Sequence, residues 1–182
     1  GLDKRPNAKP IIVNGNMAVA QRSTSVTSQN TAGYKTVDRM YANIDSAGSY
    51  TVIQESLTSG NAYNNGFKKA FRLDCTTAEA TAGSAGDQTT VEQRIEGFNL
   101  SAFKKGTSSA EKYTLAFWVK ANKTGSNLQV NLRDNTNDRQ IGGTYSIASD
   151  ENWEHKVINL AADTSVSFTD VSNSNVLIKG GL

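Results

Sequence analysis

Cysteine, histidine and proline are scarce in this sequence of 182 residues, and each scarcity excludes a class of protein. The single cysteine, Cys75, has no second thiol with which to form an intrachain disulfide or a thiolate metal cluster. The single histidine, His155, cannot build a multi-histidine zinc site. The two prolines stand among many Ser, Thr, Asn and Gly residues, a composition typical of a turn-rich β protein rather than of a disordered chain.

Long apolar runs and a surplus of one charge are also missing. No stretch approaches the roughly 18 apolar residues that a membrane-spanning helix needs, so we expect no membrane insertion. The formal net charge is +2, and residues 1–10 supply all of it, with three basic side chains against one acidic one. The rest of the chain is neutral in sum and offers no basic face to a phosphate backbone, so we expect no nucleic-acid partner.

What the sequence does contain is an alternation of apolar and polar residues, which is the period of a β-strand. The clearest case is 113–119, where Leu115, Phe117 and Val119 share one face and Trp118 lies on the other. Further strands are predicted at 11–13, 23–27, 50–55, 67–75, 89–98, 128–133, 140–148, 153–160 and 176–182.

Three local features modify this pattern. Residues 34–44 have apolar side chains at helical spacing, so a short helix competes with a strand there. The pair Gly142–Gly143 interrupts a predicted strand and indicates a bulge. Cys75 falls on the apolar face of its predicted strand, so we expect a small, buried side chain.

Many short strands with regular turns predict an all-β fold, an antiparallel β-sandwich of the jelly-roll type with little helix. The length suits one domain with a proper core, which we place at residues 11–182. Residues 1–10 are polar, basic and punctuated by proline, so we expect an extended linker or docking arm before the sandwich.

Three stretches carry a family resemblance: residues 12–22 (IVNGNMAVAQR), 34–39 (YKTVDR) and 115–125 (LAFWVKANKTG). Together they resemble virion structural proteins of tailed bacteriophages, chiefly marine ones, and the resemblance extends over nearly the whole chain. It implies a tail-fibre or other virion structural protein with a carbohydrate-binding-module-like jelly roll, located at the particle surface or the tail. It further implies other virion proteins as partners, a homo-oligomer that is a trimer by analogy, and more strands after Leu182, so that the domain is truncated there.

Trp118 is the centre of a candidate glycan site. A flat aromatic ring stacks on the C–H face of a sugar, while polar neighbours pair with the sugar hydroxyls. The alternative is that Trp118 packs under a loop or in a subunit interface, because tryptophan is usually well buried and is enriched at interfaces. The predicted strands near it supply the polar partners Gln129, Asn131, Arg133, Arg94 and Arg72.

The acidic residues of 89–98 do not form a glycosidase pair. Glu92 and Glu96 lie four residues apart on one strand, about 13 Å at roughly 3.3 Å per residue, whereas hydrolysis needs about 5 to 9.5 Å. His155 has no nucleophile elbow of the G-x-S-x-G kind to act with. We therefore predict no catalytic residue and a protein that is not an enzyme, although two carboxylates from different strands stay open as an alternative.

Residues 134–138 (DNTND) place oxygen ligands at alternate positions, loosely like a calcium loop. Arg139 and Tyr145 occupy the positions where such a loop has its glycine and glutamate, so we predict no metal site and no cofactor.

The leading hypothesis is a non-enzymatic tail-fibre or surface-appendage domain that binds a host-surface polysaccharide. The alternative hypothesis is a structural protein that decorates the capsid or connects tail parts and has no glycan ligand.

Overall fold

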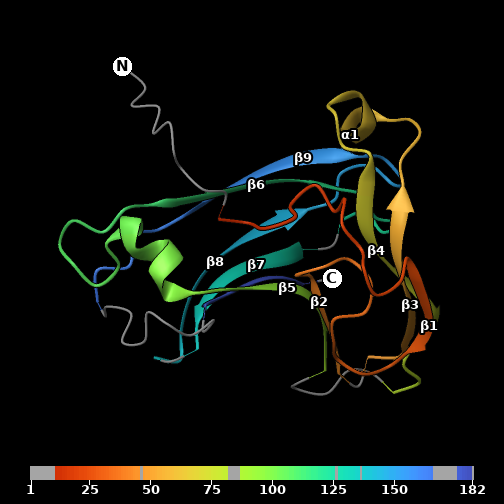
Figure 1. The fold of residues 1–182 in the computed structure, drawn as a ribbon, viewed down its shortest axis with the longest axis horizontal. Helices are drawn as coiled ribbons and strands as arrows, with labels where there is room; N and C mark the ends of the chain where they lie inside the picture. Colours follow the sequence, from red (N-terminus) through yellow and green to blue (C-terminus); the bar gives the residue numbers. More distant parts are fainter. Residues whose placement is uncertain are drawn as a thin grey trace.

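The computed structural model describes residues 11–45, 47–81, 87–125, 127–135 and 137–165, together with the backbone of 176–181. These residues form ten β-strands, one turn of α-helix and a short 3-10 helix, and the strand pairs are antiparallel (Figure 1). The elements are β1 (Ser25–Gln29), β2 (Tyr41–Asp45), β3 (Ser49–Ser56), α1 (Asn61–Asn64), β4 (Lys69–Thr77), β5 (Gln88–Ile95), the 3-10 helix η1 (Gly97–Phe103), β6 (Tyr113–Val119), β7 (Asn127–Asp134), β8 (Arg139–Ser146), β9 (Glu154–Leu160) and β10 (Val176–Gly181).

The strands form two layers, one continuous and the other divided. The continuous layer is a five-stranded sheet in the order β2-β5-β10-β7-β8. The divided layer consists of the three-stranded sheet β1-β3-β4 and the two-stranded sheet β6-β9, which cover different parts of the five-stranded sheet (Figure 1). The chain passes from one layer to the other after β1, β2, β4, β5, β6, β8 and β9, as in a jelly roll. The predicted all-β antiparallel sandwich is confirmed.

Each part of the divided layer has its own hydrophobic core against the five-stranded sheet. Burial of one aliphatic side chain in such a core stabilises the fold by roughly 1.5–3 kcal/mol. The predicted apolar face of β6 points inward, where the ring of Phe117 packs edge-on against Tyr145 of β8 with 5.1 Å between centroids. The buried residues are Ile95, Leu100, Tyr113, Leu132 and Leu160 under β6-β9, and Ala42, Ile44 and Val52 under β1-β3-β4.

The segment 11–22, drawn in red in Figure 1, lies between the two parts of the divided layer. The strand predicted at 11–13 is wrong, because these residues form bends and a turn. Side-chain amides, rather than a neighbouring strand, pair with their backbone. Gln93 of β5 bonds both backbone groups of Val13, at 2.7 and 2.8 Å, and Gln54 of β3 donates to the carbonyl of Met17 at 2.7 Å.

Asn14 organises the turn within the segment 11–22. Its backbone has a positive φ of 56°, a conformation that asparagine tolerates better than most residues. Its side chain accepts from the amide of Val19 at 3.0 Å and donates to the carbonyl of Asp38 at 2.9 Å. The side chain therefore closes the turn and fastens it to the segment before β2.

The bulge predicted at Gly142–Gly143 is wrong, because the register between β7 and β8 is continuous through both glycines. The glycines make room for neighbours instead. A Cβ on Gly142 would lie 2.2 Å from Oδ1 of Asn131, and a Cβ on Gly143 would lie 2.6 Å from Cγ2 of Ile158. Gly143 thus allows β9 to pack closely on β8, and Gly142 leaves space for the amide of Asn131.

Two other local predictions are resolved by tertiary contacts. Residues 34–44 contain no helix, because Tyr41 already begins β2, which pairs with β5. Val37 and Met40 are buried in the turn before that strand, which explains the apolar spacing.

The prediction that Cys75 is buried is wrong. Cys75 lies beside a register shift near the end of β4, whose last three residues are exposed.

The linker predicted for residues 1–10 lies outside the described residues. The strand predicted at 176–182 is present as β10, and it runs between β5 and β7 in the middle of the five-stranded sheet. Within the described ranges, no helix has the length and apolar character needed to cross a membrane.

Candidate functional site

The five-stranded sheet has one face against the core and one face outward. Along β7, Leu128, Val130 and Leu132 are buried, so the alternate residues Gln129 and Asn131 point outward. The same alternation applies to β2, β5 and β8. We call this outward surface the polar face. Its described members include Tyr41, Asn43, Thr90, Glu92, Arg94, Gln129, Asn131, Arg133 and Gln140.

Four of the six residues predicted to bind glycan lie together on the polar face. Arg94 belongs to β5, and Gln129, Asn131 and Arg133 belong to β7. Only β10 separates the two strands. At about 4.8 Å per strand, their backbones are roughly 10 Å apart, a distance that long side chains span easily.

Trp118 is not part of this group, because β6 belongs to the other layer and its inward face is taken by Leu115, Phe117 and Val119. The Trp118 ring therefore points away from the core on the opposite side of the sandwich. It is half-buried and tilted against His155 of β9, its cross-strand partner, with 5.1 Å between ring centroids.

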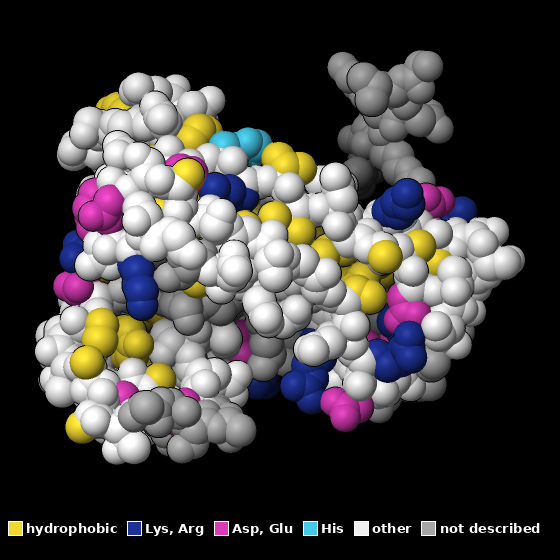
Figure 2. Space-filling model, turned by 180° about the vertical axis from the view of Figure 1, so that it is seen from behind, with side chains coloured by type: hydrophobic (Ala, Val, Ile, Leu, Met, Phe, Trp, Pro, Cys, Tyr) yellow, Lys and Arg dark blue, Asp and Glu magenta, His cyan; other side chains and the backbone are white. Residues whose placement is uncertain are grey.

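The outward face of the β6-β9 ribbon is partly apolar. Val157 is 53% exposed beside Ala116, and Thr114 donates to the amide oxygen of Asn159 at 2.9 Å. Figure 2 shows hydrophobic side chains next to the histidine on this part of the surface. The ribbon thus presents one aromatic pair and a small apolar strip, rather than an aromatic ring surrounded by polar groups.

Arg72, the sixth predicted residue, lies on β4 of the three-stranded sheet. Its guanidinium forms ion pairs with Glu55 at 3.3 Å and Asp74 at 3.1 Å. These two carboxylates satisfy its charge within its own sheet, so the structure does not bring Arg72 to the polar face.

Tyr41 is an aromatic residue of the polar face that is not among the six predicted glycan-binding residues. The guanidinium carbon of Arg94 lies 5.0 Å from its ring centroid, and Tyr34 packs edge-on against it at 5.1 Å. The signal was present in the sequence, because Tyr41 alternates with the buried residues Ala42 and Ile44. The competing helical spacing of 34–44 concealed it.

A buried carboxylate holds the neighbouring polar groups in place. Glu92 is only 2% exposed, and its Oε1 accepts hydrogen bonds from Asn43 Nδ2 and Thr90 Oγ1, both at 3.0 Å. On β7, the amide of Asn131 lies in the space left by Gly142. The polar face therefore has several side chains whose positions are set before any ligand arrives.

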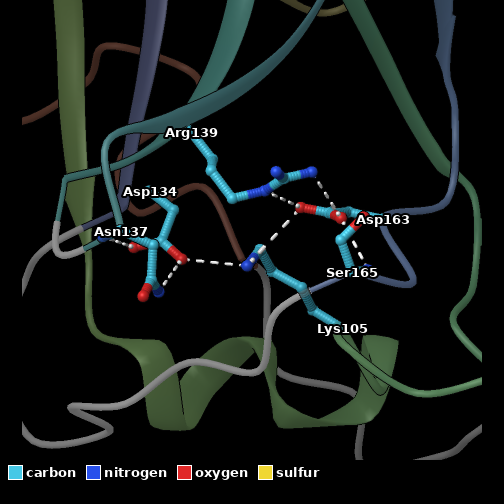
Figure 3. A network of polar contacts seen from close by, with 6 residues as sticks. All are labelled: Lys105, Asp134, Asn137, Arg139, Asp163 and Ser165. Atoms are coloured by element: carbon cyan, nitrogen blue, oxygen red, sulfur yellow. Dashed lines mark hydrogen bonds and ion pairs between the residues drawn. The ribbon is translucent and has the colours of Figure 1, made fainter.

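A second polar constellation is buried at the ends of β7 and β8, and we call it the buried charge cluster (Figure 3). The ammonium of Lys105 lies 2.9 Å from Asp134 and 3.5 Å from Asp163, and all three side chains are at most 6% exposed. Arg139 adds an ion pair to Asp163 at 3.2 Å. Asn137 donates to Asp134 at 2.8 Å, which completes a network from four segments of the chain.

The partners in this cluster determine its pKa values. Burial acts to raise the pKa of Asp134, but hydrogen bonds from Asn137 and Lys105 and the charge of Lys105 outweigh it, so the pKa is lowered. Burial also acts to raise the pKa of Asp163, and the Ser165 amide, Arg139 and Lys105 outweigh it in the same way.

Tyr113 borders the same cluster, around a cavity of about 10 Å³ that Lys105, Asp134 and Asp163 also line. Burial, followed by the charges of Asp163 and Asp134, raises the pKa of the Tyr113 hydroxyl to about 12. That hydroxyl is buried and has no hydrogen-bond partner among the described residues. The phenol therefore stays protonated over the whole physiological pH range.

The buried charge cluster is an internal connection rather than a ligand site. Its carboxylates are paired with cations, and it ties the segment after η1 to β7, β8 and the segment after β9. In the predicted calcium-like stretch 134–138, Asp134 is bound to Lys105 and Asp138 to Arg133. In the part of the chain that the structure describes, no three His, Cys, Asp or Glu side chains are grouped to hold a metal ion.

No protein-family model and no curated protein matches the sequence. Among solved structures, the chain is similar to an arabinose-bound MgGH51 α-L-arabinofuranosidase at 18% sequence identity and a TM-score of 0.49. The match covers 87% of this chain and 23% of that chain, so this chain spans about a quarter of the enzyme's length. A likeness of this size establishes neither a family nor an activity.

Proposed function

We propose that this chain is a non-enzymatic structural component of a tailed-phage virion, a tail-fibre or surface-appendage domain whose polar face binds a host-surface glycan. The virion location and the other virion proteins as partners come from the resemblance of 12–22 and 115–125 to phage proteins. The glycan comes from the polar face. The observation that carries the proposal is that Gln129, Asn131, Arg133 and Arg94 lie on one sheet surface, with Tyr41 of the edge strand β2 in contact with Arg94.

The chemistry of the polar face suits a sugar. Amide groups of Gln129 and Asn131 offer both donors and acceptors, which is what a hydroxyl needs. Tyr41, held by Tyr34 and Arg94, adds a half-buried aromatic side chain with a hydroxyl that both donates and accepts. Because these groups lie on strands rather than loops, their positions are well defined before binding.

Binding without hydrolysis fits the carboxylates of the polar face. Glu92 is buried and accepts two hydrogen bonds, and Glu96 forms an ion pair with Arg39 at 3.6 Å. Glycoside hydrolysis by the usual route needs two carboxyl groups on either side of the scissile bond. We therefore assign Glu92 a positioning role.

A glycan array with the whole chain tests the proposal, with two variants on the polar face and one on the opposite side. We expect Tyr41→Ala and Asn131→Ala each to weaken binding about tenfold, since each removes roughly 1–2 kcal/mol of contact. Trp118→Ala is the matched control and is expected to bind as the wild type does. Loss of binding in Trp118→Ala alone would transfer the site to the β6-β9 ribbon, and absence of any glycan binding would contradict the proposal.

The second candidate function is capsid decoration or tail connection without a glycan. The observation that favours it is the exposed apolar strip of Val157 beside Trp118 and His155, a surface that suits a protein neighbour. Either function is compatible with a homo-oligomer, a trimer by analogy with phage fibres. A whole-particle reconstruction distinguishes them, because a neighbour seated on the β6-β9 ribbon and on the polar face together leaves no surface for a sugar.

A further inference from the structure

We infer that the glycan bound by the polar face carries a carboxylate and that Arg94 is the residue that binds it. The inference rests on the proposed function, because it names the ligand class of the same surface. It goes beyond that function by separating anionic glycans from neutral ones. Three observations lead to it: the alignment of arginines across the sheet, the pairing of each arginine, and the way the Arg94 guanidinium is held.

The arginines are aligned by the strand register. Arg94 of β5 and Arg133 of β7 both pair with Leu177 of β10, so they occupy one row across three strands. Arg39, just before β2, continues the row, since its guanidinium donates to the carbonyl of Arg94 at 3.2 Å. Three arginines thus lie at one end of the polar face, and we call them the arginine row.

Arg94 is the member of this row that forms no ion pair with a carboxylate of the described residues. Arg39 forms an ion pair with Glu96 at 3.6 Å, and Arg133 forms one with Asp138 at 2.8 Å. Every other arginine of the described residues also has a carboxylate within ion-pair distance. Arg94 is exposed and has no such partner among the described residues; its contact is with a ring. Among the described arginines, Arg94 therefore stays available to an anionic ligand.

The guanidinium of Arg94 is also oriented. It lies over the ring of Tyr41, and that contact limits the directions in which its N–H groups point. A guanidinium presents its donors as a planar fork that matches the two oxygens of a carboxylate, and such charge-assisted pairs are about twice as strong as neutral hydrogen bonds.

Glu92 precedes Arg94 by two residues on the same face of β5, but its carboxylate is buried and accepts hydrogen bonds from Asn43 and Thr90. The exposed guanidinium of Arg94 is therefore where a sugar acid places its carboxylate, with its hydroxyls toward amides such as that of Asn131. A neutral sugar leaves the Arg94 guanidinium without a charged partner.

The test is an array of glycans of three kinds: neutral oligosaccharides, oligomers of galacturonate, glucuronate, mannuronate and sialate, and sulfated oligosaccharides. The strongest carboxylated probe is then compared with its methyl ester, which keeps the sugar and removes the charge. We expect the acid to bind at least tenfold more tightly than the ester, and higher salt to reduce the difference. Arg94→Ala abolishes this preference, and Arg94→Lys restores part of it, because lysine keeps the charge without the fork.

The outcomes separate the inference from the function on which it rests. Equal binding of acid and ester, a preference for sulfated or neutral probes, or an unchanged acid-to-ester ratio in Arg94→Ala would overturn the carboxylate inference and leave glycan binding in place. Absence of binding to all three kinds of probe would overturn both. Arg94 is exposed, so an unchanged unfolding midpoint in both variants confirms that any loss of binding is local.

Discussion

The buried charge cluster and the arginine row have similar charged groups and opposite environments. In the cluster, Lys105, Asp134 and Asp163 are at most 6% exposed, and each contacts an opposite charge. In the row, Arg133 is 38% exposed and Arg94 has no carboxylate partner in the described part of the chain. Burial makes pairing obligatory, because an unpaired charge out of water costs several kcal/mol. An exposed charge is solvated by water and does not need a partner, so a surface arginine can stay available for a ligand.

The largest effect that this comparison predicts is the loss of Lys105. Lys105→Met keeps most of the side-chain volume but leaves two buried carboxylates without their shared ammonium, so we expect the free energy of unfolding to fall by about 3–5 kcal/mol. The matched control is Lys104→Met, whose ammonium is 54% exposed and 3.5 Å from Glu111. There we expect a loss of at most about 1 kcal/mol, because surface pairs are weak. Denaturant unfolding measures both, and similar losses in the two variants would contradict the distinction.

Acid should destabilise the protein through the same cluster. The pKa values of Asp134 and Asp163 are lowered in the folded state, so unfolding takes up protons once the solution approaches the unfolded value of about 3.9. Their stabilisation is therefore fully present above about pH 4 and is lost as the pH falls through the lowered folded values. Unfolding midpoints measured between neutral and acid pH should decline less steeply in Asp163→Asn. Asp138→Asn, at a side chain that is 85% exposed, is the control expected to follow the wild type.

A smaller effect is expected at Tyr113. Its hydroxyl has no partner among the described residues, so Tyr113→Phe should change the free energy of unfolding by no more than about 1 kcal/mol at neutral pH. The folded pKa of about 12 lies above the ordinary value of 10. The associated stabilisation is fully present below about pH 10 and is lost as the pH rises through about 12. Alkaline unfolding curves of wild type and Tyr113→Phe should therefore diverge in that window, and parallel curves would show that the phenol is not buried as described.

The smallest effect on stability is expected at Arg94. Arg94→Ala removes an exposed contact with Tyr41, which contributes about 0.5–1 kcal/mol. Thermal or denaturant unfolding should therefore barely distinguish it from the wild type, in contrast with Lys105→Met. A loss above about 2 kcal/mol would place Arg94 among the structural charges and remove the basis for a ligand role.

Much of the polar face could be predicted from strand alternation. Gln129, Asn131 and Arg133 alternate with buried residues, and so does Arg94 on β5, so the outward direction of each was evident in the sequence. Trp118 shows the limit of that reasoning. Alternation placed it on an outward face but could not tell which of the two layers β6 joins, and β6 joins the layer opposite β7. Tyr41 shows another limit, because its segment matches both helical and strand periods.

The sequence by itself determined most of the strands, most of their inward and outward faces, and the absence of an intrachain disulfide and of multi-histidine chemistry, because these follow from local periodicity and residue counts. Tertiary structure alone decided which strands are neighbours, and with that which side chains meet. It placed β10 between Arg94 and Arg133, brought Lys105 to Asp134 and Asp163, and divided the second layer around the segment 11–22. The physical reason is that strand pairing and layer assignment depend on contacts between residues far apart in the chain, which a local pattern does not encode.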